Sequence, residues 1–100
     1  MASASKAKGA GFERELVNEA KALGLDAKRA WGSNGEALGE ACTVDLVVSG
    51  MRVQAKRRRA LPNYLEIPDG CDAVAFREDR GETLVLMRWG DVLARLRAEL

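Results

Sequence analysis

The sequence predicts an α/β protein with a small mixed central sheet flanked by helices. Two observations carry this prediction. Apolar residues recur at helical spacing near both ends of the chain, and short runs that alternate apolar and polar residues fill its middle. With 100 residues the chain has room for one domain and one modest core. We expect that domain to span residues 9–100, after a flexible basic arm at residues 1–8.

The clearest helix is expected over residues 12–23. Phe12, Leu16, Ala20 and Leu23 recur at helical spacing and would share one side of the helix. Gly24 follows at once, in the place where helices commonly end.

A strand and a hairpin are expected next. Residues 25–31 alternate in the manner of a strand, and residues 32–42, rich in Gly, Ser, Asn and Glu, are typical of a loop. Residues 43–57 contain two strand-like runs on either side of Ser49 and Gly50, which predict a two-residue turn.

This turn fixes which side chains of the hairpin share a face. One face is apolar or small and carries Val44, Leu46, Val48, Met51, Val53 and Ala55. The other face pairs Val47 with Arg52, Asp45 with Gln54, and Thr43 with Lys56. A slip of one residue would bury the charged side chains, so the register is strongly specified.

The second half predicts a further hairpin and a final helix. Pro62 is expected to open a short helical turn. Strands are expected at residues 72–77 and 83–88, with a turn at residues 79–82 between them. Asp91 is expected to cap the last helix, whose apolar side carries Val92, Leu93, Leu96 and Leu100.

Composition excludes several kinds of chemistry. The chain has no histidine, which excludes Ser-His and Cys-His catalysis. Two cysteines, Cys42 and Cys71, are too few for a structural zinc site. We interpret them as reduced structural thiols of a cytoplasmic protein. No run approaches the roughly 20 apolar residues of a membrane span. Catalysis would therefore depend on carboxylates, Lys, Arg, Tyr or Ser, with or without a hard metal ion.

The net charge of +1 does not by itself indicate a nucleic-acid partner, but the charges are unevenly distributed. Basic residues crowd one short stretch, namely Arg52, Lys56, Arg57, Arg58 and Arg59. Acidic residues lie around it in sequence, namely Glu36, Glu40, Asp45, Glu66, Asp69 and Asp72. A basic patch beside carboxylates suits a phosphate substrate with a metal. A solvated charged face is the alternative.

The polar face of the first hairpin gathers a carboxylate, a carboxamide and an ammonium. Mg²⁺ takes one or two carboxylates together with waters and phosphate oxygens. Asp45 is the anionic ligand expected, and Gln54 offers a neutral oxygen. Lys56 would orient or deprotonate the attacking water, or offset charge on the phosphate. The alternative is an ordinary solvent-exposed hairpin face.

These residues resemble a known nuclease motif. Asp45, eight intervening residues and then Gln54-Ala55-Lys56 resemble the core of the PD-(D/E)xK nuclease superfamily. Segment 8–16 (KGAGFEREL) resembles the N-terminal helix of archaeal-type Holliday junction resolvases, and the hairpin at residues 70–87 resembles phage and bacterial relatives of these resolvases. Segments 28–33 (KRAWGS) and 44–47 (VDLV) resemble the strand, the loop and the catalytic strand that follow.

The resemblance implies a restriction-endonuclease-like core and a divalent-metal endonuclease that acts on branched DNA in recombination and repair. It implies Mg²⁺ or Mn²⁺ as cofactor, in a bacterial or phage-infected cell. Glu13 is then the helix-borne acidic residue that approaches the metal site, beside Asp45 and Gln54, and Lys56 carries over as catalytic.

The resemblance also implies how DNA is held. Arg14 and Arg29 would contact phosphates, and Ser33 would lie in a mobile loop near the scissile strand. Arg57, Arg58 and Arg59 would bind backbone phosphate without reading sequence. A homodimer is expected, because resolving a four-way junction takes two cuts and a twofold dimer supplies two symmetric sites.

Two departures from the family pattern keep other functions open. Gln54 stands where the family usually has Glu, and the loop at residues 32–44 is longer, with Glu36 and Glu40 as substitute ligands. One alternative is a nicking endonuclease without junction preference on the same core. Another is a catalytically inactive DNA-binding module, and a third is a structural protein whose polar hairpin face is merely solvated.

Overall fold

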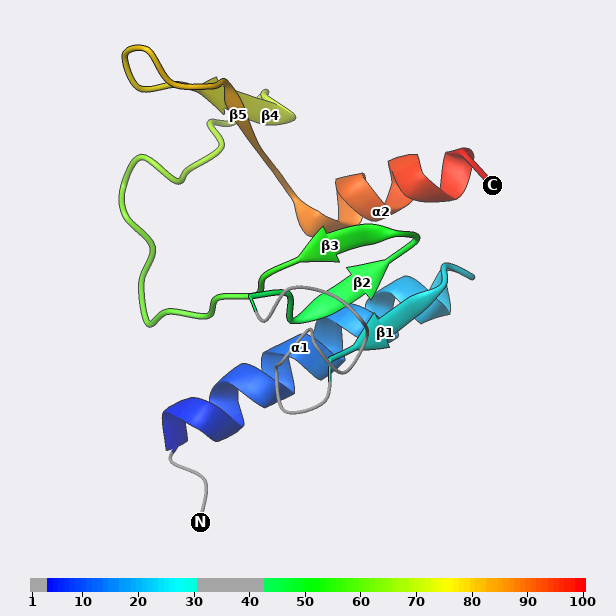
Figure 1. Cartoon of the computed structure of the whole chain (residues 1–100). Coiled ribbons are helices and arrows are strands. Elements are labelled where there is room, and N and C mark those ends of the chain that lie inside the picture. The colour runs from blue at the N-terminus through cyan, green and yellow to red at the C-terminus, as the bar shows by residue number, and fades with distance from the viewer. Residues whose placement is uncertain (1–3, 31–42) are drawn as a thin grey trace. The chain divides into compact units, whose positions relative to one another are not determined.

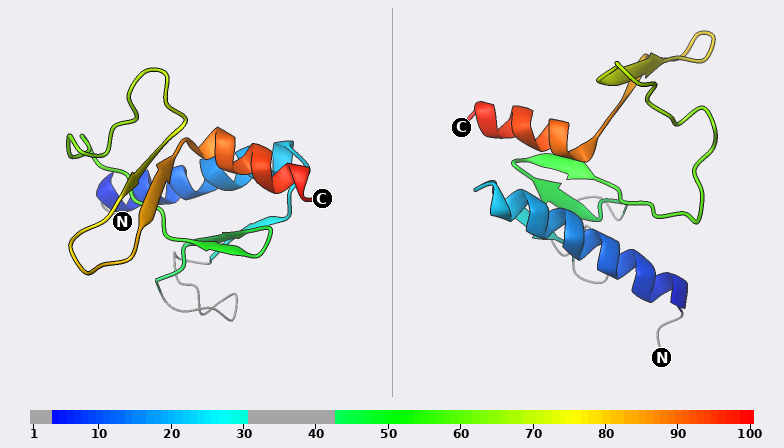
Figure 2. Two further views of the ribbon diagram at one scale, coloured as in Figure 1. Left: turned by 90° about the horizontal axis from the view of Figure 1, so that it is seen from above. Right: turned by 180° about the vertical axis from the view of Figure 1, so that it is seen from behind.

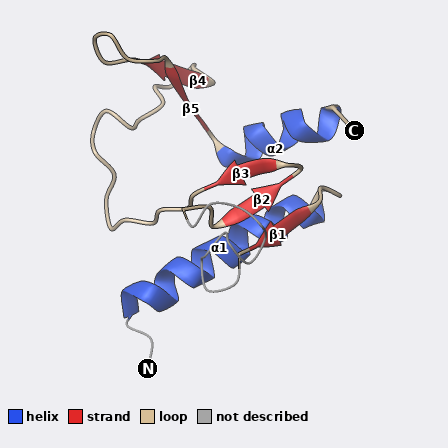
Figure 3. Cartoon of the chain, in the orientation of Figure 1, coloured by secondary structure: helices blue, strands red, loops and turns tan. Residues whose placement is uncertain are grey.

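The computed structural model describes residues 4–30 and 43–100, with residues 4–8 described by their backbone alone. The chain forms two compact units, Met1–Arg57 and Arg58–Leu100. The described residues contain two helices and two small antiparallel sheets (Figure 1, Figure 3). This confirms the predicted α/β class, with the strands in two separate sheets in place of one mixed central sheet. The single domain over residues 9–100 stays a prediction.

The first helix, α1 (Ala4–Ala22), begins eight residues before its predicted start at Phe12. The difference has a local reason, because Ala and Lys, which dominate this part of the chain, have high helix propensity. Residues 4–8, expected to belong to a flexible arm, are therefore helical in the structure.

The end of α1 lies where the sequence predicts it. Gly24 adopts a φ of 81°, which a glycine accepts without steric cost. Its N–H donates to the carbonyl of Lys21 at 2.9 Å, and the N–H of Leu25 donates to the carbonyl of Ala20 at 3.1 Å. These two bonds form a Schellman motif, which satisfies carbonyls at the helix end and turns the chain toward the first strand.

The first unit holds a three-stranded antiparallel sheet in the order β1-β2-β3. Its strands are β1 (Ala27–Arg29), β2 (Leu46–Val48) and β3 (Met51–Val53). The pairs Leu46↔Val53, Val47↔Arg52 and Val48↔Met51 confirm the predicted hairpin register. Ser49 and Gly50 have φ values of 47° and 82°, and a turn with two positive φ angles matches the twist of the flanking strands.

The core of the first unit lies between α1 and the sheet, because α1 packs on β1 and β2 (Figure 2). Its buried apolar side chains are Leu16, Val17, Ala20, Leu25, Ala27, Ala30, Val44, Leu46 and Val48. In the hairpin, the buried residues alternate with partly or fully exposed ones, as the period of a strand requires.

The second unit holds the hairpin of β4 (Ala73–Phe76) and β5 (Leu84–Met87), paired from Ala73↔Met87 to Phe76↔Leu84. Both predicted strands are confirmed. The turn between them closes with a bond from the Gly81 N–H to the Glu78 carbonyl at 2.9 Å. The Pro62 carbonyl accepts one bond from the Leu65 N–H at 2.9 Å, so this segment forms the single short turn that the sequence predicts there.

The last helix, α2 (Trp89–Ala98), follows β5 almost directly. The prediction that Asp91 caps it is wrong, because the N-cap residue is Arg88, which makes no side-chain capping bond. Asp91 lies in the first turn, with one carboxylate oxygen 3.9 Å from the Arg88 guanidinium. An acidic residue is favourable both at the N-cap and in the first turn, since both lie at the positive end of the helix dipole. The sequence pattern therefore could not tell at which of the two positions Asp91 lies.

No helix in the described part of the chain is long and apolar enough to cross a membrane. Cys71 is a free cysteine, as predicted for a reduced thiol, and it is exposed at the surface. Cys42 lies outside the described residues.

Candidate active site

The carboxylate of Asp45 is held at the end of the first hairpin. Asp45 precedes β2, is partly buried, and accepts a hydrogen bond at Oδ2 from the backbone N–H of Ala55 at 2.8 Å. The bond joins the chain before β2 to the chain after β3, across ten residues. A backbone N–H that points at a carboxylate fixes its orientation, so Asp45 has a defined direction in the site.

A β-bulge places Asp45 in this position. Leu46 pairs with Val53 in the ladder, and the N–H of Asp45 also donates to the Val53 carbonyl at 2.9 Å. Two residues of one strand therefore face one residue of the other, which bends the strand and redirects its side chains. The Asp45 carbonyl in turn accepts the N–H of Ala30 at 2.8 Å.

The bulge changes the predicted pairing of the polar face. The ladder ends at Leu46↔Val53, so the expected pairs Asp45 with Gln54 and Thr43 with Lys56 are not formed as ladder partners. Bulges commonly interrupt ladders near strand ends, and a strict period of two does not foresee them. Gln54 and Lys56 follow β3 as exposed residues.

A second carboxylate, that of Glu13, comes from α1. Only 4% of Glu13 is exposed, so a charged residue lies on the buried face of the helix. Its Oε2 accepts a bond from Arg29 Nε at 2.9 Å. Arg29 belongs to β1, so this ion pair links the helix to the sheet.

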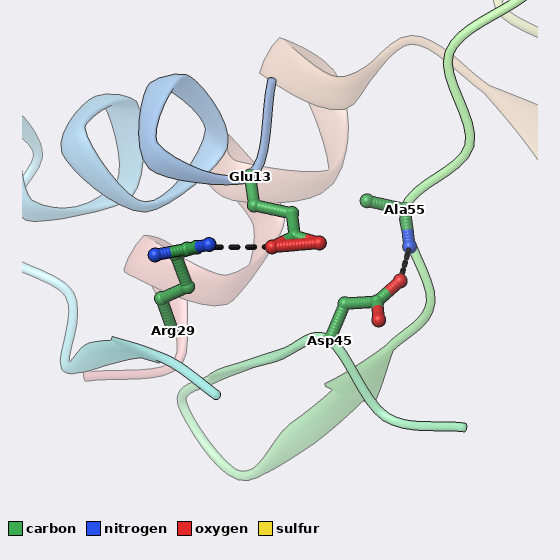
Figure 4. Close-up of polar contacts among 4 residues, drawn as sticks. All are labelled: Glu13, Arg29, Asp45 and Ala55. Atoms are coloured by element: carbon green, nitrogen blue, oxygen red, sulfur yellow. Dashed lines mark hydrogen bonds and ion pairs between the residues drawn. The ribbon is translucent and has the colours of Figure 1, made fainter. Parts of the chain in front are cut away.

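Figure 4 shows how the two carboxylates lie. The Glu13 side chain extends from α1 into the space between Arg29 and the pair formed by Asp45 and Ala55. One Glu13 oxygen is turned to Arg29, and the other is turned toward the side of Asp45 and Ala55. All four residues belong to the first unit, and they come from three separate stretches of sequence.

The donor set can be compared with the needs of a metal ion. Within residues 4–30 and 43–100, no three or more Asp, Glu, Cys or His side chains are grouped to hold one. Mg²⁺ needs fewer, since it keeps several waters and takes one or two carboxylates with substrate phosphates. Two carboxylates directed by Ala55 and Arg29 therefore fit a hard divalent ion in the kind and number of donors.

The other expected residues are distributed more widely. Arg14 is exposed on α1, and Arg57, Arg58 and Arg59 are exposed after β3. Arg57 belongs to the first unit, and the second unit begins at Arg58. Ser33, Glu36 and Glu40 lie outside the described residues.

Two contacts of the candidate site were not foreseen from the sequence. One is the backbone N–H of Ala55 as the partner of Asp45, which depends on the bulge. The other is the ion pair between Arg29 and Glu13. The sequence had suggested only that Arg29 contacts DNA phosphate. A signal for the second exists, because Glu13 precedes Leu16, Val17 and Ala20 by three, four and seven residues and so falls on the apolar face.

Comparisons with known proteins give no match: no family model fits the sequence, and no curated protein or solved structure is similar to it.

Proposed function

We propose that this protein is a metal-dependent endonuclease that resolves branched DNA by phosphodiester hydrolysis. We also propose that its core is restriction-endonuclease-like, similar to that of archaeal-type Holliday junction resolvases. The observation that carries it is the arrangement in which Glu13 of α1 extends toward the hairpin end that holds Asp45 (Figure 4). Directed carboxylates from different elements, next to a lysine-bearing segment, are what metal-assisted hydrolysis of a phosphodiester needs.

Asp45 and Glu13 would hold a Mg²⁺ or Mn²⁺ ion through their carboxylates, and Gln54 is the neutral oxygen donor of the set. When bound, such an ion supplies charge stabilisation for the phosphate and activation of water. Lys56 carries an ammonium that orients the attacking water or offsets the charge that grows on the phosphate oxygens. Water forms the new bond to phosphorus, the bond to the leaving oxygen breaks, and a proton passes to that oxygen.

The DNA would be held by basic side chains. Arg14, Arg57, Arg58 and Arg59 are exposed, and their guanidinium groups suit backbone phosphates of any sequence. Ser33, which lies outside the described residues, would act in the loop near the scissile strand, as the resemblance implies. A homodimer supplies the second cut that a four-way junction requires. We propose that the enzyme acts in the cytoplasm of a bacterial or phage-infected cell.

The direct test is cleavage of a labelled four-way junction with Mg²⁺, Mn²⁺ or EDTA. We expect paired, symmetric nicks that need the metal and fall by at least about a hundredfold in Asp45→Asn and Lys56→Ala. The matched controls are Asp26→Asn and Lys28→Ala, which change the same residue types at exposed positions of the same unit. Equal cleavage of junction, flap and linear duplex would instead indicate a nicking endonuclease without junction preference.

A second candidate function is a catalytically inactive DNA-binding module, favoured by Gln54, which is neutral and exposed. Tight junction binding without cleavage by the wild-type protein would support it. Gln54→Glu is then the informative variant, because it restores the carboxylate usual in the family. A lack of salt-sensitive DNA binding would exclude both functions, since phosphate contacts release counterions.

A further inference from the structure

The starting observation is a charged residue in an apolar environment. Glu13 lies on the buried face of α1 together with Leu16, Val17 and Ala20, and only 4% of it is exposed. Removing a carboxylate from water is costly unless a partner compensates for it. The buried face of α1 therefore needs a specific reason to retain Glu13.

One partner is Arg29, whose Nε donates to Glu13 Oε2 at 2.9 Å while 24% of the Arg29 side chain stays exposed. Buried ion pairs are weak evidence for stability, because well-packed apolar residues of similar volume often serve equally well. A stabilising role alone thus does not account for the pair. The direction in which the pair holds the Glu13 carboxylate indicates a further role. The pair turns the second oxygen of Glu13 toward the side of Asp45 and Ala55 (Figure 4).

We infer that Arg29 is a positioning residue, which directs the Glu13 carboxylate toward a divalent cation shared with Asp45. The inference rests on the proposed function, because it assigns Glu13 to the metal. Arginine suits this role since its planar, permanently charged guanidinium fixes the direction of a carboxylate that it contacts. Side chains that hold metal ligands in place are known to change metal affinity by about 10–100-fold when they are lost.

If Arg29 instead contacts DNA phosphate, its loss should have a different effect. A phosphate contact contributes to DNA binding without metal, and its loss lowers the salt dependence of that binding by about one counterion. A positioning residue leaves both unchanged. Junction binding in EDTA at several salt concentrations therefore separates the two roles in Arg29→Gln.

The deciding experiment measures binding of Mn²⁺ alone to the full chain, by the electron paramagnetic resonance signal of the unbound ion. We expect Arg29→Gln to weaken Mn²⁺ binding by about tenfold, as Glu13→Gln does. The double variant should bind no more weakly than either single variant, because Arg29 acts through Glu13. Lys28→Gln, a change at the exposed neighbouring residue of β1, is the matched control and should bind as the wild type does.

Arg29→Lys keeps the charge without the planar group and should bind Mn²⁺ with intermediate strength. It also replaces Arg29→Gln if that variant does not fold, which circular dichroism would reveal. Unchanged or stronger Mn²⁺ binding in the folded Arg29 variants would overturn the inference while leaving the proposed function intact. Wild-type protein that binds no Mn²⁺, or binds it independently of Asp45, would overturn both.

Discussion

The carboxylate of Asp45 accepts the backbone N–H of Ala55 at 2.8 Å, and this bond closes the first hairpin beyond the last pair of its ladder. The same carboxylate is the central ligand of the proposed metal site. Asp45 thus has a structural and a chemical role that substitutions can separate.

Asp45→Ala should lower the free energy of unfolding by about 1–3 kcal/mol, because it leaves the Ala55 N–H without its acceptor. Asp45→Asn keeps an acceptor oxygen and should cost less. Urea denaturation of both variants checks the order, with Asp26→Ala as the control at an exposed position of the same unit. Equal losses in Asp45→Ala and Asp45→Asn would mean that the hydrogen bond contributes little.

The ion pair between Glu13 and Arg29 can be replaced as a whole. Arg29→Met alone should lower the free energy of unfolding by about 3 kcal/mol, because it removes a cationic partner from the buried Glu13 carboxylate. Glu13→Leu alone should cost less, because the Arg29 side chain that it leaves behind is 24% exposed. The double variant should recover most of that stability, while its Mn²⁺ binding stays about tenfold weaker than that of the wild type and its DNA cleavage stays reduced. Glu19→Leu, on the exposed side of α1, serves as the control. A double variant that is less stable than either single variant would contradict this account.

The turn at Ser49 and Gly50 offers a test that is independent of function. Gly50 has a φ of 82°, and a Cβ there meets no neighbouring atom within 4 Å, so strain in the backbone is the expected cost. Gly50→Ala should destabilise the protein by about 1 kcal/mol, measured as a lower Tm. Ser49→Asn should raise Tm slightly, because asparagine tolerates positive φ in this kind of turn. Junction cleavage should be the same in both variants once they are folded.

Arg58→Ala should weaken binding to DNA of every sequence by about the same factor and reduce the salt dependence by about one counterion. Filter binding or fluorescence anisotropy at several salt concentrations measures both effects. Arg95→Ala, which removes the same charge from an exposed position of α2, is the matched control. A loss confined to one DNA sequence would show that Arg58 reads bases and does not contact phosphate.

Much of the local structure could be predicted because its causes are local. Gly24 ends α1 since it accepts a positive φ at no cost, and this depends on no distant contact. The register of β2 and β3 follows from a two-residue turn and from alternation of apolar residues. The start of α1 was less well predicted, because helix ends depend on propensities that differ by fractions of a kcal/mol.

The residue types of the candidate site came from the sequence, whereas its geometry came from the structure. Asp45 was identified as the central carboxylate, but its expected partner Gln54 is replaced by the backbone of Ala55. A single extra residue at the bulge is enough to cause this, since the side-chain period of a strand is two. Glu13 was identified by resemblance alone, while its partner Arg29 follows from the packing of α1 on β1.

The sequence by itself determined the helix end at Gly24, the hairpin from Leu46 to Val53 and the presence of hard oxygen donors without histidine. Only the tertiary structure decided that Glu13 is buried and that Arg29 compensates its charge. The physical reason is that periodicity and turn preference act over a few residues. The pairing of charges 16 residues apart, by contrast, exists only once packing of helix and sheet has removed water from around them.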